Sequence, residues 1–165
     1  MPLAFYLSDA AMVILALAVV ASARAQRRHK IVKRWVLLLP GLLAALAVVA
    51  DLAFPQIMDL VNLQIWTAGV VGFLIGGLRG QFMRLDSDHN WGLVRTRDGR
   101  DELWVAYFFA AVAIIHFGIE MHIQTVSAIM PSGVLAMTLT GGYLLGRSLI
   151  GWIRAGQVDH VDLRD

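Results

Sequence analysis

The chain has 165 residues, of which 58% are hydrophobic and 16% are charged, and its mean hydropathy is +0.67. Soluble domains carry about 25% charged residues, so this composition excludes an ordinary soluble domain and favours a membrane protein with several apolar spans. The formal net charge of +2 does not indicate nucleic-acid binding. The basic residues lie in short segments between apolar runs, where anionic lipid headgroups are their expected neighbours. Cysteine is absent, which excludes disulfides, thiolate metal sites and thiol–disulfide exchange within this chain.

The first two expected membrane spans cover residues 4–22 and 35–54. No positive charge precedes the first apolar run, whereas several basic residues follow it, so we expect an uncleaved helix rather than a signal peptide. The second span carries Pro40 and Gly41 about one turn inside its start, where a proline can bend a helix locally. Asp51 lies near the far end of this span.

The third expected span covers residues 62–82 and is rich in glycine. Each glycine costs a helix in water about 1 kcal/mol relative to alanine. In a bilayer the helix persists, and glycines on one face form a flat surface for close helix contact. We interpret this face as packing within the chain rather than as a dimer interface, and its members are Gly69, Gly72, Gly76 and Gly80.

The only sizeable polar segment covers residues 84–101. Side-chain polarity alternates over residues 91–97, and Asp98–Gly99 is typical of a turn, so the sequence predicts a small β-hairpin here.

The fourth and fifth expected spans cover residues 102–123 and 133–153. Gly142 and Gly146 form a second small-residue face in the fifth span. We expect the polar tail, residues 154–165, to lack fixed structure. The chain is therefore predicted to be one all-α integral membrane domain of five transmembrane helices, formed by residues 1–153, with the hairpin between the third and fourth helices.

The distribution of basic residues predicts the orientation. All fourteen lysines and arginines fall within residues 24–34, 79–100 and 147–164, which lie on the same side of a five-span protein. Under the positive-inside rule, the N-terminus is then outside and the C-terminus is cytoplasmic.

Ionisable residues inside apolar spans are candidates for function. His116 and Glu120 are four residues apart and share a helical face, with Asp51 and His122 expected at the same outer side. A carboxylate beside an imidazole suits a proton relay or a ligand site. His116 and Glu120, with Asp51 as a third ligand, could also bind Zn, Cu or Fe. We prefer a structural interpretation, in which these groups are interhelical contacts or reach headgroups and water, and no cofactor is predicted.

Arg79 is flanked by glycines just inside the cytoplasmic boundary. It is a candidate for binding an anion or a lipid headgroup, and the alternative is an arginine whose side chain extends to the surface. No phosphate-binding loop and no nucleophile motif such as G-x-S-x-G is present, which argues against an enzyme.

The segment of residues 72–104 resembles the CcdC-like family of small bacterial integral membrane proteins. The resemblance rests on the end of a glycine-rich span, on two dipeptides of the polar segment and on the start of the next span: Gly77-Leu78-Arg79-Gly80, Met83-Arg84, Val94-Arg95, Asp98-Gly99 and Leu103-Trp104. It implies an all-helical protein of the bacterial inner membrane, and the family name implies a link to cytochrome c biogenesis. Without cysteine, direct reductant transfer in such a pathway is excluded.

Three functions follow as hypotheses. The first is a non-enzymatic inner-membrane accessory or scaffold protein in envelope or cytochrome biogenesis. The second is a membrane protein that handles protons, metals or electrons through the His/Glu/Asp cluster. The third is a small dimeric transporter. The expected partners are the lipid bilayer and either another membrane protein or a second copy of the chain.

Overall fold

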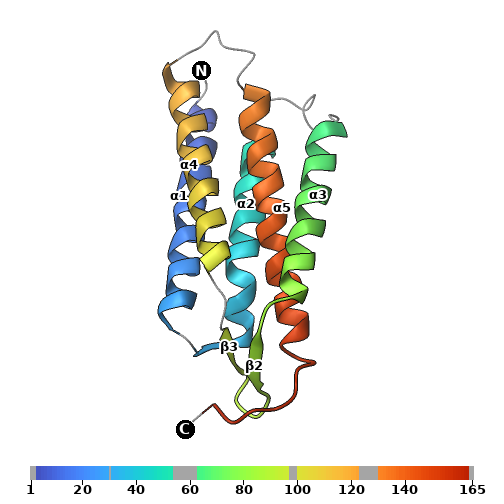
Figure 1. The fold of residues 1–165 in the computed structure, drawn as a ribbon. Coiled ribbons are helices and arrows are strands. Elements are labelled where there is room, and N and C mark those ends of the chain that lie inside the picture. The colour runs from blue at the N-terminus through green and yellow to red at the C-terminus, as the bar shows by residue number, and fades with distance from the viewer. Residues whose placement is uncertain (1–2, 30, 54–62, 97–99, 123–129, 164–165) are drawn as a thin grey trace.

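The computed structural model describes residues 3–29, 31–53, 63–96, 100–122 and 130–163, although the side chains of residues 3–9, 53, 120–122, 130 and 131 fall outside the description. Within these ranges it contains five long helices arranged side by side, with a small β-sheet at one end (Figure 1). The helices are α1 (Leu3–Arg28), α2 (Leu39–Ala53), α3 (Leu63–Gln81), α4 (Arg100–His122) and α5 (Met130–Arg154). Five helical segments of the described chain are long and apolar enough to cross a membrane, and the second of these, Arg34–Leu52, begins five residues before α2.

The interior of the bundle is built from small and flexible side chains. Helix α1 packs on α2 and α4, whereas α5 packs on α2, α3 and α4. Alanines from three helices, among them Ala16, Ala44 and Ala110, surround the fully buried Phe109 and Met137. Small residues allow helices to approach closely. Many large apolar side chains are instead exposed on the outside of the bundle, which is compatible with a membrane environment.

Helices α3 and α5 are in backbone contact through their glycines. A Cβ atom on Gly72 would overlap the carbonyl of Leu139, and one on Gly76 would overlap the carbonyl of Tyr143. From the other side, a Cβ atom on Gly146 would overlap the carbonyl of Phe73. The remaining members of the two glycine faces also lie at this contact: Gly69 against Thr138, Gly80 against Arg147, and Gly142 against Gly69.

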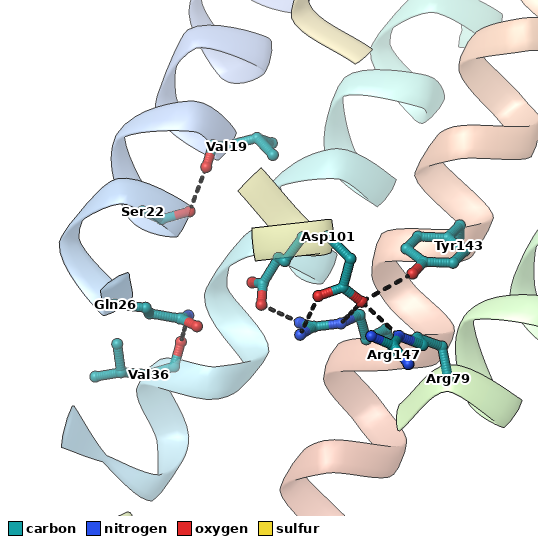
Figure 2. A network of polar contacts seen from close by, with 9 residues as sticks. Val19, Ser22, Gln26, Val36, Arg79, Asp101, Tyr143 and Arg147 are labelled. Carbon is teal, nitrogen blue, oxygen red and sulfur yellow. Dashed lines mark hydrogen bonds and ion pairs between the residues drawn. The ribbon is translucent and has the colours of Figure 1, made fainter. Parts of the chain in front are cut away.

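The segment expected as the second span begins as a 3-10 helix, η1 (Arg34–Leu38), and becomes α-helical at Leu39. Pro40 lies in the first turn of α2, directly after η1, and without an N–H it cannot donate a hydrogen bond back to the carbonyls of η1. The side chain of Gln26, at the end of α1, donates a 2.6 Å hydrogen bond to the carbonyl of Val36 and so fastens α1 to η1 (Figure 2).

The sheet has three antiparallel strands in the order β1-β3-β2, with β1 at Ile31–Lys33, β2 at Leu85–Asp88 and β3 at Leu93–Thr96. The predicted hairpin is formed by β2 and β3, and β3 lies within the alternating stretch of residues 91–97. Its turn falls at residues 89–92, where Gly92 has a φ of +60°. The expected turn residues, Asp98–Gly99, lie outside the described residues. Strand β1 was not predicted.

The tail was expected to lack fixed structure, and this expectation is wrong for its described part. Val161 donates a 2.9 Å backbone hydrogen bond to Ser87, and His160 forms a parallel bridge with the same residue. A second apolar cluster links the sheet and the tail to the bundle, with Leu37, Met83, Leu85, Val94 and Ala155 as its buried members. The tail is ordered because it lies along the edge of β2.

Candidate functional site

One end of the bundle interior holds a carboxylate and an imidazole from different helices. Asp51 of α2 and His116 of α4 are 3.5 Å apart, measured from Oδ1 to Nε2, and each side chain is only 5% exposed. Asp51 was expected at this site only as a third member. The structure brings it directly to His116.

The pair joins two helices that pack chiefly on other neighbours, since α2 and α4 contact α1 and α5 more extensively than they contact each other. Helix α5 forms the other wall of the site. A Cβ atom on Gly133 would lie 2.8 Å from His116 Nδ1, so a glycine at this position lets the imidazole lie against the helix backbone. The ring is thus held with one nitrogen toward Asp51 and the other toward α5.

A cavity of about 200 Å³ adjoins the imidazole. His116, Ser132 and Gly133 line it together with apolar side chains of α4 and α5. The surface of this cavity is predominantly apolar, whereas a bound water needs about two to four polar partners. The geometry therefore places a buried carboxylate beside an imidazole, and the imidazole at the edge of a largely apolar cavity.

The other two residues of the predicted cluster cannot be placed in this way. Glu120 and His122 belong to α4, but their side chains lie outside the described residues. Among the side chains that are described, no three of His, Cys, Asp or Glu are grouped closely enough to hold a metal ion. The predicted pairing of His116 with Glu120 stays a prediction.

A second polar cluster, drawn in Figure 2, lies where α4 begins, at the sheet end of the bundle in Figure 1. At its centre is Arg147 of α5, whose side chain is 3% exposed. Its Nε and Nη2 donate hydrogen bonds of 3.3 Å to the two carboxylate oxygens of Asp101, and its Nη1 donates to Glu102 Oε2. Asp101 also accepts hydrogen bonds from Arg79, at 2.9 Å, and from the hydroxyl of Tyr143, at 3.3 Å.

This cluster ties α3, α4 and α5 together with two carboxylates and two guanidinium groups, so its charges cancel when all four are ionised. Such compensation is what permits charges in a bundle interior, because a buried charge without a partner is costly. One atom is left over: Glu102 Oε1 is buried and has no hydrogen-bond partner among the described residues.

Arg79 was a candidate for binding an anion or a headgroup, with a side chain that extends to the surface as the alternative. Its guanidinium pairs with Asp101, a carboxylate of the chain itself, while the side chain remains 51% exposed. The carboxylate of Asp101 thus takes the place of an external anion at Arg79. Contact of Arg79 with a lipid headgroup stays a prediction.

Sequence reasoning did not identify Asp101, Glu102 or Arg147 as a cluster. The available signal was the position of Arg147, which lies seven residues before Arg154, the residue that ends α5. An arginine at that depth in an apolar span calls for a buried acidic partner. Asp101 and Glu102, in the first turn of α4, are acidic residues at the same end of the bundle.

Comparison of the chain with protein-family models, with curated proteins and with solved structures finds no match. The similarity to the CcdC-like family is neither supported nor contradicted by these comparisons.

Proposed function

We propose that this chain is a non-enzymatic, multi-pass protein of the bacterial cytoplasmic membrane that takes up and releases a proton at the Asp51–His116 pair. The observation that carries the proposal is a carboxylate and an imidazole held 3.5 Å apart, both 5% exposed, inside a bundle of apolar helices. The distribution of basic residues supports an N-terminus outside and a C-terminus in the cytoplasm. The pair would then lie toward the outer face.

The position of the imidazole favours proton exchange over a purely structural contact. His116 contacts Asp51 and also lines a cavity, so a proton on the ring has an acceptor in Asp51 and the ring is not packed against protein on every side. A merely structural link between α2 and α4 would not need such a pair. Apolar residues of similar volume hold helices together as well as a buried ion pair or better.

A vibrational titration tests the proposal. Infrared difference spectra of the protein in lipid nanodiscs, recorded between acidic and neutral pH, should contain carboxyl and imidazole bands that vanish in Asp51→Asn and His116→Gln. Asp159→Asn and His89→Gln are matched controls, because both residues are exposed outside the helices. The controls should keep the bands that the two interior variants lose.

If Asp51→Asn and His116→Gln show the same difference bands as the unchanged chain, the pair does not exchange protons and the proposal fails. A lowered thermal stability of both variants, with unchanged bands, would instead favour the structural role expected of an accessory or scaffold protein.

A further inference from the structure

A basic pocket lies between the last turns of α1 and the first turns of α4. It has a volume of about 760 Å³, and its basic side chains are Arg24, Arg27, Arg28 and His29. All four residues are exposed. Leu103 and Tyr107 of α4 form the opposite wall.

The positive charge of this pocket is not neutralised by the described part of the chain. None of the lining residues is acidic. The nearest carboxylates along α4, Asp101 and Glu102, are directed to Arg147 and Arg79. The contact of Arg24 is with the face of the Tyr107 ring, 5.7 Å from its centre, which holds the guanidinium at the pocket without removing its charge.

The pocket continues into an apolar stripe along the outside of the same two helices. On α1, residues 14, 17, 21, 24 and 28 follow one another at steps of three and four, so Ile14 and Leu17 lie on the same face as Arg24 and Arg28. Both are more than half exposed. On α4, Ile114 lies two turns beyond Tyr107 and is 47% exposed. A ligand here would therefore meet guanidinium groups at one end and a hydrocarbon-like surface beyond them.

We infer that this pocket binds the phosphate group of an anionic phospholipid, with the acyl chains along the Ile14–Leu17 stripe. Guanidinium groups bind phosphate oxygens in paired, charge-assisted hydrogen bonds. Basic pockets between membrane helices on the cytoplasmic side suit anionic headgroups. The inference requires the membrane insertion that the proposed function assumes, but it does not depend on the Asp51–His116 pair, so the two can fail separately.

The test compares thermal stabilisation of the detergent-purified protein by phosphatidylglycerol, by phosphatidylcholine with the same acyl chains, and by inorganic phosphate. Phosphatidylglycerol should stabilise the protein at lower concentration than either of the others. The apparent affinity for phosphatidylglycerol should fall as ionic strength rises, because exposed charges are screened by salt.

Arg24→Gln combined with Arg28→Gln should weaken phosphatidylglycerol binding about 25-fold, since each basic residue near an anionic lipid surface contributes about fivefold. The matched control is Lys33→Gln combined with Arg84→Gln, which removes the same charge from exposed sites outside the pocket. The control should bind as the unchanged chain does.

Equal loss in both double variants would show that only net charge matters and would overturn the inference. Equal stabilisation by the two lipids would overturn it as well. If inorganic phosphate alone reproduced the effect, the pocket would be a soluble-anion site rather than a lipid site. If the Arg24/Arg28 variant does not fold, the comparison of the two lipids and the salt dependence, both measured on the unchanged protein, still test whether the pocket binds an anionic phospholipid.

Discussion

Arg147 of α5 and Asp101 of α4 are joined by two hydrogen bonds of 3.3 Å, one to each carboxylate oxygen. This two-point contact fixes the first turn of α4 against α5, and Glu102 and Arg79 extend it on either side. Arg147 is therefore the residue that compensates both carboxylates, Asp101 and Glu102, at the sheet end of the bundle.

Arg147→Met is therefore expected to lower the free energy of unfolding by about 3–5 kcal/mol, because it leaves Asp101 and Glu102 without their shared cation. Unfolding in mixed detergent micelles measures this change. Adding Glu102→Gln to Arg147→Met should recover part of the loss, since one of the stranded charges is then removed. Arg84→Met, at an exposed position, is the control and should change stability by less than about 0.5 kcal/mol. A neutral Arg147→Met variant would mean that the cluster does not stabilise the bundle.

Gly76→Ala should destabilise the protein by about 1–3 kcal/mol, the usual cost of forcing extra atoms into a filled contact. The added methyl group would overlap the backbone of Tyr143 in α5, where no side chain can move aside. Gly118→Ala is the matched helical control, because a Cβ atom there has no heavy atom within 4 Å. Thermal melts and size-exclusion profiles should show a less stable protein with an unchanged oligomeric state. A stable protein with altered oligomeric state would place the glycine face at a dimer interface instead.

Gly92→Val should cost about 1–2 kcal/mol through backbone conformation alone, because the left-handed region disfavours residues with a Cβ atom. The φ of Gly92 is +60° and open space surrounds it, so steric contact with the rest of the chain is not the cause. Gly92→Asn should be milder, since asparagine tolerates this region. Similar melting temperatures for the two variants would contradict this explanation.

The chain lacks cysteine, so single cysteines can report the side of the membrane directly. Asn90→Cys in the hairpin turn should be shielded from an impermeant maleimide added to intact cells and should react after permeabilisation. Gln64→Cys, at the opposite end of the bundle near the start of α3, should react in both cases. Reaction of both positions from the same side would contradict the five-span orientation.

The helices follow from local properties of the sequence, whereas the contacts between them do not. Apolar runs of about 20 residues predict membrane-length helices whatever their neighbours are. Strand β1 has three residues and pairs with β3 about sixty residues later, at Val32 and Val94, so nothing local marks it. The Asp51–His116 and Arg147–Asp101 contacts depend on how each helix is rotated about its own axis, which one sequence does not define. The glycines of α3 were recognisable because a close helix contact restricts residue size at regular spacing.

At the glycine contact, the backbones of α3 and α5 touch directly, with no side chains between them, along much of their shared length. Translation or rotation of one helix relative to the other would make their backbones clash. The two helices should therefore move together as one rigid unit. Among the described helices, α2 and α4 contact this unit through α5, so relative movement is expected at those contacts. These two helices supply the Asp51–His116 pair, and α4 also forms one wall of the basic pocket.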